Sequence, residues 1–398
     1  MKAAKPTGIL PIIVISQFLC TSLWFAGNAV LPDIVKNFPL EHNLLANLTS
    51  MVQFGFITGT LLFAFFAISD LFSPSKVFFV CGIAAALFNL AICLEITDVR
   101  LLLLFRFLTG FMLAGIYPVG MKIASDYFKD GLGKSLGFLV GALVLGTAFP
   151  HLLKTFTANF PWKYVIYATS TLSVIGACSI FFFVADGPFR KPGQKFDFRS
   201  CLSGFKNPGF RSAAFGYFGH MWELYTFWAF LPAMLLHYNG VHPTAELNIP
   251  LFSFLVIGSG GLSCMIGGLL SQKFGAKRIA MIALAISGLC CLLSPVFLFA
   301  DSVYALLFFL FIWGLSGTAD SPLFSSLIAK NAPESLRGTS LTLVNCIGFA
   351  ITIISIQVIN VLAKEMNSHY LYMVLAIGPV LGLLALLKNN TAKNNHEY

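Results

Sequence analysis

Apolar stretches about 20 residues long recur along almost the whole chain, and their length leaves few folds open to it. A helix needs about 20 mainly apolar residues to cross a bilayer, whereas a barrel strand needs about 10 residues of alternating polarity. Only 10% of the 398 residues are charged, against roughly 25% in soluble domains. The sequence therefore predicts an all-α integral membrane protein. The twelve expected transmembrane helices cover residues 8–31, 43–69, 76–96, 100–123, 133–154, 162–185, 211–237, 248–271, 278–300, 302–328, 338–363 and 369–387.

The orientation in the membrane follows from the basic residues of the connecting segments. The first apolar stretch lacks a small-residue cleavage site, so we expect it to stay as the first helix. With the N-terminus inside, 19 of the 25 Lys and Arg residues fall in inside segments and 5 in outside segments. Cytoplasmic loops carry the excess of basic residues. The sequence thus predicts cytoplasmic termini and a multi-pass protein of a bacterial inner (plasma) membrane.

Several classes of function are disfavoured by what the sequence lacks. The net charge of +9 comes mostly from the loop bias, and no soluble basic domain is available to bind nucleic acid. The nine cysteines show no metal-ligand spacing. No nucleophile constellation, phosphate loop or receptor output domain is visible, so we expect neither an enzyme nor a signalling receptor. We predict no catalytic residue, metal or cofactor, and a monomer whose partners are the lipid bilayer and a small-molecule substrate.

The longest connecting segment divides the expected helices into two sets of six. We expect an N-terminal six-helix bundle at 1–185, a cytoplasmic linker at 186–210 and a C-terminal six-helix bundle at 211–398. The linker is predicted from its position and from its run of glycine, proline and basic residues.

The two halves are related by a weak internal repeat. Gly110 and Pro118 recur as Gly314 and Pro322, 204 positions further along the chain. Many secondary transporters are built from such repeats, with the substrate site near the membrane midplane between them. The sequence therefore predicts two pseudo-symmetric bundles.

Short motifs follow the second and eighth expected helices. The later copy runs from Gly268 to Arg278 and has Gly275, which a tight turn between helices needs for close approach. The earlier copy keeps an acidic residue, Asp70, where the later one has Gln272. The basic residues either pair with the Asp70 side or with helix C-termini, or serve only as a positive anchor on the inside. The set expected to take part in gating is Asp70, Gly268, Gln272, Lys273, Gly275, Lys277 and Arg278.

Two further motifs lie within helices, Arg106-Phe-Leu-Thr-Gly-Phe-Met-Leu-Ala114 and Gly137-Phe-Leu-Val-Gly-Ala-Leu-Val-Leu-Gly146. Together with the loop motifs they resemble the major facilitator superfamily over nearly the whole chain. The resemblance implies that family's fold, alternating access, and a central cavity lined by the first, fourth, seventh and tenth helices. Ala142 stands where the family's proton-driven antiporters have proline, which disfavours antiport.

Arg106 lies about two turns inside an otherwise apolar helix. A charge at that depth costs at least about 2.5–3.5 kcal/mol and by default indicates function. The planar guanidinium suits a substrate carboxylate or phosphate. The alternative is an ion pair within the protein, with Glu223 or Asp320.

His220 and Glu223 are three residues apart in the seventh expected helix, so they share one helix face. A carboxyl group and an imidazole together can take up and release a proton, which predicts a coupling role for this pair. The alternative is a buried glutamate that only holds the structure together through Arg106 or a tyrosine.

Asp320 precedes Pro322, whose ring frees a backbone carbonyl one turn back. It either binds a substrate amine or a proton, or it satisfies the irregular backbone locally. The supporting residues expected at the site are Asn28, Tyr117, Trp222 and Tyr225. Trp222 and Tyr225 either stack on a ring or a cation or simply pack.

These residues lead to one principal hypothesis and one alternative. Basic groups lie in the first half and acidic groups in the second, which suits an anion moved with a proton, or a zwitterion. We expect proton-coupled import of a small polar organic solute, a carboxylate or zwitterion, with the proton as coupling ion. The alternative is a proton-driven exporter of drugs or metabolites.

Overall fold

The computed structural model describes residues 8–37, 43–94, 96, 98–128, 132–190, 202, 204–333, 337–365 and 369–394. The chain divides into two compact units. Unit 1 comprises Met1–Leu44 and Met51–Phe196, and unit 2 comprises Leu45–Ser50 and Asp197–Tyr398. The division at Phe196 falls inside the segment predicted as linker, of which residues 191–201 and 203 lie outside the described residues.

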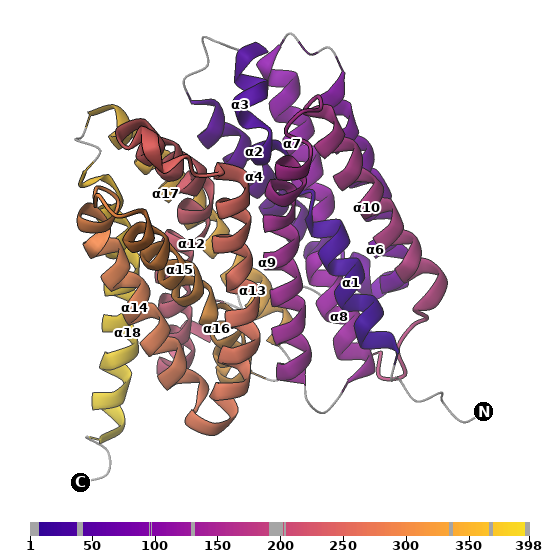
Figure 1. Cartoon of the computed structure of the whole chain (residues 1–398). Coiled ribbons are helices and arrows are strands. Elements are labelled where there is room, and N and C mark those ends of the chain that lie inside the picture. The colour runs from indigo at the N-terminus through magenta and orange to yellow at the C-terminus, as the bar shows by residue number, and fades with distance from the viewer. Residues whose placement is uncertain are drawn as a thin grey trace. The chain divides into compact units, whose positions relative to one another are not determined.

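Both units are helical (Figure 1). The helices from the N-terminus to the end of unit 1 are α1 (Ile9–Thr21), α2 (Ala26–Ala29), α3 (Leu31–Ile34), η1 (Val35–Asn37), α4 (Leu44–Phe65), α5 (Ile68–Leu71), α6 (Pro74–Leu90), η2 (Ala91–Cys93), α7 (Val99–Leu113), α8 (Tyr117–Tyr127), α9 (Leu132–Phe156) and α10 (Lys163–Phe183). Unit 2 continues with η3 (Gly204–Lys206), α12 (Pro208–Val241), η4 (Pro243–Ala245), α13 (Ile249–Phe274), α14 (Ala276–Phe297), α15 (Val303–Ala319), α16 (Ser321–Asn331), α17 (Arg337–Glu365), η6 (Leu371–Ala376) and α18 (Ile377–Asn394).

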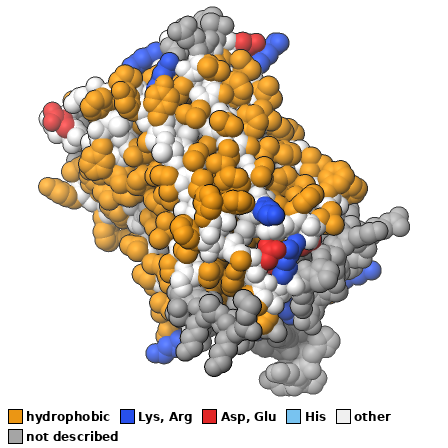
Figure 2. All heavy atoms as spheres, turned by 90° about the vertical axis from the view of Figure 1, so that its right-hand side faces the viewer, with side chains coloured by type: hydrophobic (Ala, Val, Ile, Leu, Met, Phe, Trp, Pro, Cys, Tyr) orange, Lys and Arg blue, Asp and Glu red, His pale blue; other side chains and the backbone are white. Residues whose placement is uncertain are grey.

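The prediction of an all-α membrane protein is confirmed. Within the described residues, 10 helical segments are long and apolar enough to cross a bilayer. The two other predicted spans correspond to α12 and to the interrupted run α1–α3. On the face shown in Figure 2, hydrophobic side chains cover a broad band, and most charged side chains lie toward its two ends. Such a band matches the hydrocarbon layer that these helices cross.

The first predicted span is not one continuous helix. α1 ends at Thr21, the chain turns through residues 22–25, and α2 begins at Ala26. The prediction of an unbroken helix over 8–31 was therefore wrong in this detail. Nothing in the turn's sequence, Ser-Leu-Trp-Phe, marks a break, because it contains neither glycine nor proline.

The internal repeat appears in the packing of the helices. A Cβ atom added to Gly110 on α7 would lie within 2 Å of the Val52 carbonyl oxygen on α4. A Cβ added to Gly314 on α15 would lie 2.5 Å from the Val256 carbonyl oxygen on α13. Val52 and Val256 are separated by the same 204 positions as the two glycines. Each unit thus uses glycine to bring the same pair of helices into backbone contact.

Proline marks a second repeated feature. Pro118 lies in the first turn of α8 and Pro322 in the first turn of α16, and each short helix follows a break from a longer one. Proline cannot donate a backbone hydrogen bond and is tolerated at helix starts. The corresponding span of each unit is therefore built from two helical pieces.

We predict that Gly314→Ala lowers the free energy of unfolding by about 1–3 kcal/mol, because the added methyl group has no room beside Val256. The thermal unfolding midpoint of the purified protein in detergent measures this effect. Gly268→Ala is the matched control, since nothing lies within 4 Å of a Cβ at that position of α13. Equal midpoints for the two variants would show that the close approach does not contribute to stability.

Candidate functional site

Arg106 lies on α7 in unit 1, and its side chain has no exposed surface. Nη2 donates a hydrogen bond to the Trp24 carbonyl oxygen at 2.6 Å. Nη1 donates to the Leu23 carbonyl oxygen and to Oδ1 of Asn89, both at 3.3 Å. The guanidinium therefore binds the turn between α1 and α2 and one side chain of α6.

This arrangement explains how the first span can be interrupted. Carbonyl groups at a helix end have no partner within the helix, and a buried carbonyl without a partner is costly. Arg106 supplies donors to two of them. Gly27 leaves room for the guanidinium, because a Cβ there would lie 3.3 Å from Nε of Arg106.

Asn89 extends the network to a third helix. Its amide nitrogen donates to Oγ of Ser170 at 2.9 Å and to Oγ1 of Thr169 at 3.2 Å, both on α10. Its oxygen accepts from Arg106. Arg106 thus belongs to a hydrogen-bond network that joins the turn after α1 to α6, α7 and α10.

The sequence analysis left two kinds of partner open for Arg106: a substrate, or an ion pair with Glu223 or Asp320. Among the ion pairs of the described chain, none includes Arg106. Its partners within unit 1 are backbone carbonyls and an amide. Glu223 and Asp320 belong to unit 2, so an ion pair with either of them stays a prediction. Within the described residues Nε has no hydrogen-bond partner. Contact with a substrate stays a prediction.

Glu223 lies on α12 in unit 2 and is 2% exposed. Its two carboxylate oxygens have different partners. Nε1 of Trp313, on α15, donates to Oε1 at 2.6 Å. Oγ of Ser287, on α14, donates to Oε2 at 2.9 Å. Both donors are neutral, and no basic side chain among the described residues donates a hydrogen bond to this carboxylate.

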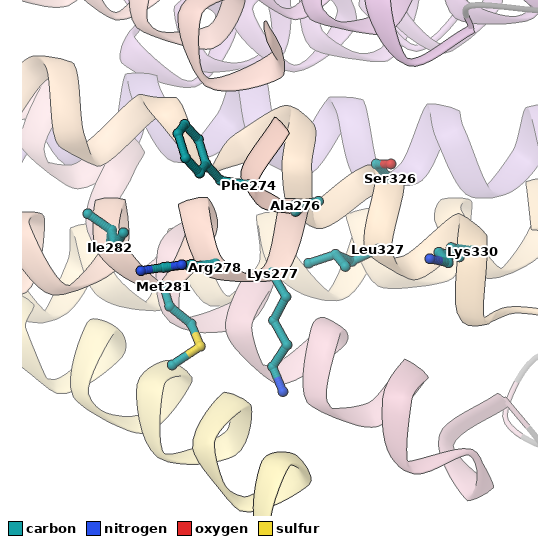
Figure 3. A pocket seen from close by; sticks show the side chains of 10 residues that line it. Phe274, Ala276, Lys277, Arg278, Met281, Ile282, Ser326, Leu327 and Lys330 are labelled. Carbon is teal, nitrogen blue, oxygen red and sulfur yellow. The ribbon is translucent and has the colours of Figure 1, made fainter. Parts of the chain in front are cut away.

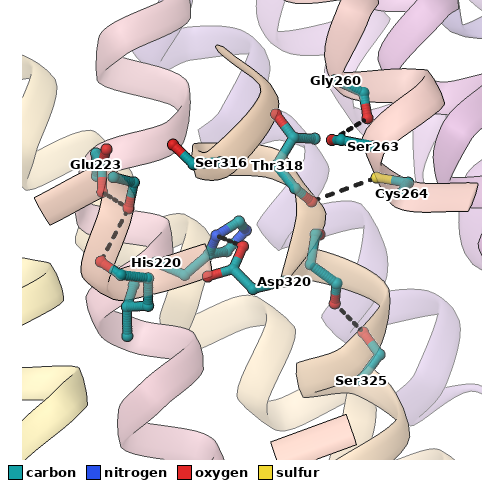
Figure 4. A network of polar contacts seen from close by, with 12 residues as sticks. His220, Glu223, Gly260, Ser263, Cys264, Ser316, Thr318, Asp320 and Ser325 are labelled. Carbon is teal, nitrogen blue, oxygen red and sulfur yellow. Dashed lines mark hydrogen bonds and ion pairs between the residues drawn. The ribbon is translucent and has the colours of Figure 1, made fainter. Parts of the chain in front are cut away.

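His220 lies one turn before Glu223 and contacts Asp320, the residue between α15 and α16 (Figure 4). Nδ1 of His220 is 2.8 Å from Oδ1 of Asp320, and the two side chains are 1% and 0% exposed. The contact is within ion-pair distance but is not aligned as a hydrogen bond. Both Asp320 oxygens and Nε2 of His220 therefore lack a hydrogen-bond partner within the described chain.

The prediction that His220 and Glu223 share one helix face is confirmed, since both reach the same broken span, α15 and its junction with α16. The structure adds two residues that the sequence analysis missed. Trp313 is seven positions before Asp320, which places both on one side of the helix, and this spacing was a usable signal. Ser287 had no such signal, because it is one of many serines in apolar helices.

The supporting residues are distributed over both units. Asn28 on α2 and Tyr117 at the start of α8 are buried in unit 1. In unit 2, Tyr225 is buried, with ring centroids 5.0 Å from Trp228 and 5.2 Å from Phe349. Trp222 donates from Nε1 to the Val374 carbonyl oxygen at 3.2 Å, so it faces η6 rather than the partners of Glu223.

The expected gating residues take up different environments. Lys122 of α8 forms an ion pair with Asp70, and Arg190 donates to the Asp70 carbonyl oxygen at 2.9 Å. These partners belong to unit 1, as Asp70 does. Gly275 has a φ of 86°, a conformation that favours glycine, and it separates α13 from α14. No atom lies within 4 Å of a Cβ added there, so the prediction that glycine serves a close approach was wrong.

The other members of that set lie in α13 or at the start of α14, on either side of this turn. Nζ of Lys273 lies 5.3 Å from the ring centroid of Phe274. Gln272 is exposed. No neighbouring atom lies within 4 Å of a Cβ added at Gly268, so this glycine serves no close approach in the described chain. A gating role for these residues stays a prediction.

The arrangement of apolar helices and buried polar clusters is that of a membrane transport protein. A family model of the Major Facilitator Superfamily matches residues 13–356 and 213–396. The chain belongs to the major facilitator superfamily, and it is a secondary transporter rather than an enzyme.

One curated relative and two solved structures illustrate the similarity. The chain is 25% identical over 279 residues to the uncharacterized MFS-type transporter YuxJ of Bacillus subtilis (strain 168), a match that spans 65% of this chain and 65% of that relative. The proton:xylose symporter XylE superimposes with a TM-score of 0.75 at 11% identity, over 98% of this chain and 96% of that chain. The human organic anion transporter MFSD10 (TETRAN) superimposes with a TM-score of 0.73 at 14% identity, over 95% of this chain and 98% of that chain. At these identities the solved structures establish the fold alone.

We predict that Arg106→Lys lowers the free energy of unfolding by about 1.5–3 kcal/mol even without any solute, because one ammonium group cannot serve Leu23, Trp24 and Asn89 together. Thermal unfolding in detergent measures the loss. Arg100→Lys, at an exposed position of the same helix, is the matched control. A normal midpoint for Arg106→Lys would mean that simple charge suffices at this position.

Proposed function

We propose that this transporter imports a small polar organic solute, a carboxylate or a zwitterion, together with a proton. It would act by alternating access in a bacterial inner membrane, with both termini in the cytoplasm. The observation that carries the proposal is the buried carboxylate of Glu223, which has two neutral hydrogen-bond donors as its closest partners.

Glu223 is suited to exist with and without a proton. Burial of an anion in apolar surroundings is costly, and binding a proton removes that cost. The hydrogen bonds from Trp313 and Ser287 stabilise the carboxylate instead. Because these effects oppose each other, modest changes around the group decide whether it holds a proton, which is the requirement for a coupling residue.

The contact between His220 and Asp320 supports the same proposal. The contact of 2.8 Å places an imidazole and a carboxylate, two proton-binding groups, side by side. This pair lies one helical turn from Glu223. Unit 2 therefore offers two neighbouring places for a proton.

The polarity of the solute is inferred from groups that still have hydrogen-bonding capacity. The two oxygens of Asp320 can accept from an ammonium group, and Nε of Arg106 can donate to a carboxylate. A zwitterion carries both of the groups that these residues favour. A simple carboxylate would use Arg106 and leave Asp320 to the proton.

One observation favours the alternative, a proton-driven exporter of lipophilic cations. Next to Glu223, Phe227 and Trp313 are stacked with ring centroids 4.5 Å apart. Aromatic faces beside a carboxylate are suited to bind organic cations. The direction of transport in proteoliposomes separates the two functions, because solute enters with the proton in one case and leaves against it in the other.

We predict that Glu223→Gln abolishes uptake driven by an inward proton gradient while the protein stays folded, because the amide cannot gain or lose a proton. Uptake into proteoliposomes, with and without the gradient, is the measurement. Glu365→Gln is the matched control, since this glutamate is exposed at the end of α17. Full retention of gradient-driven uptake by Glu223→Gln would refute the proposed coupling role.

We also predict that one class among anionic, cationic and zwitterionic metabolites stabilises the purified protein. A ligand at 100 times its dissociation constant adds about 2.7 kcal/mol to the free energy of unfolding. For a zwitterion, Asp320→Asn should remove this gain and the exposed Asp301→Asn should retain it. Stabilisation only by bulky lipophilic cations would support the exporter instead.

A further inference from the structure

A basic pocket lies at the turn between α13 and α14, in unit 2 (Figure 3). Its volume is about 730 Å³, and it is lined by the residues of the turn, the first turns of α14 and the end of α16. Lys277, Arg278 and Lys330 contribute to the lining, and none of the residues that line the pocket is acidic. This basic pocket is separate from Glu223 and Asp320 and has no part in the proposed coupling.

The charges of the basic pocket favour the binding of an anion. Three cationic side chains around one cavity repel each other, and a bound anion removes that repulsion. The ion pairs of the described chain include neither Arg278 nor Lys330. Lys330 also offsets the C-terminal end of α16.

The start of α14 adds a further positive element. Gly275 and Ala276 line the pocket, and no side chain caps the first turn of this helix. The free backbone N–H groups at a helix start favour a negative charge nearby. Here they lie beside side chains that favour the same charge.

The walls of the basic pocket also contain several apolar side chains, which a small anion would not need. Phe274, Met281, Ile282 and Leu327 also line it. Phe274 is 47% exposed and Ile282 is 48% exposed. An occupant with a negative headgroup and hydrocarbon chains would contact both kinds of surface.

We propose that the basic pocket binds the headgroup of an anionic phospholipid. The phosphate would lie against Lys277, Arg278 and Lys330, and the acyl chains would pass along Phe274 and Ile282. Because the loop bias places this turn on the cytoplasmic side, the lipid would come from the leaflet that is richer in anionic lipid. The bound headgroup would join the α13–α14 turn to the end of α16.

The test compares three added molecules on the purified full chain in detergent: a phosphatidylglycerol, the phosphatidylcholine with the same chains, and inorganic phosphate. Thermal unfolding is followed while each is titrated. The pocket variant is Lys277→Gln/Arg278→Gln/Lys330→Gln. The control variant is Lys206→Gln/Arg211→Gln/Lys388→Gln, which removes equal charge elsewhere in unit 2.

The proposal predicts that phosphatidylglycerol stabilises the wild type and the control variant at equal concentrations. The pocket variant should need about tenfold more of this lipid. Phosphatidylcholine should not distinguish the three proteins, and inorganic phosphate should not replace the lipid at matching concentration. Added salt should weaken the effect of phosphatidylglycerol.

Two outcomes would overturn the proposal. Equal loss of the lipid effect in both variants would mean that overall charge, and not this pocket, attracts the lipid. Equal stabilisation by inorganic phosphate would make the pocket a site for free phosphate. If the pocket variant does not fold, Arg278→Gln and Lys330→Gln are tested singly, and unchanged lipid dependence in both would equally refute the proposal.

Discussion

The guanidinium of Arg106 and the carbonyls of Leu23 and Trp24 form the contact on which the architecture of unit 1 depends. A helix interrupted inside a membrane exposes carbonyls that lipid cannot satisfy, and an arginine buried without partners is equally costly. Here the guanidinium donates hydrogen bonds to the carbonyls, and the carbonyls provide the partners that the buried arginine needs. The turn after α1, the small residue Gly27 and the network through Asn89 then follow from the need to surround one charged group. This explains why a basic residue occupies a fully buried position of the largely apolar helix α7.

Unit 2 meets a similar constraint with acidic groups and without an arginine. Glu223 is held by an indole and a hydroxyl, and Asp320 lies at the junction of α15 and α16 beside His220. Arg106 has donors that satisfy fixed carbonyls and it keeps its proton. In the proposed mechanism, the acidic groups of unit 2 exchange theirs. The proposal thus assigns unit 1 a permanent charge that supports the backbone, and unit 2 groups whose charge changes during transport.

The length and hydropathy of the spans were sufficient to predict the helical membrane fold, and the recurrence of Gly110 as Gly314 predicted a repeat that the packing confirms. The residues of the polar clusters were also found, since ionisable side chains are rare in apolar helices. The hydrogen-bond partners of these residues could not be predicted from the sequence. Two of the partners of Arg106 are backbone carbonyls 82 and 83 positions away, in a turn whose sequence carries no breaking residue. Glu223 pairs with Ser287, one of many serines, and only the fold distinguishes that serine from the others.

The contacts at Gly110 and Gly314 have a mechanical consequence. At these contacts the glycine has no side chain that could change rotamer and allow one helix to slide along the other. The helices of each pair, α4–α7 and α13–α15, should therefore move together as a rigid body within their unit. Shape changes during transport would then concentrate at joints outside these pairs, such as the turn at Gly275 and the breaks before Pro118 and Pro322. The repeated helix pairs would thus stay rigid during transport, and the chain would bend at these glycine and proline positions.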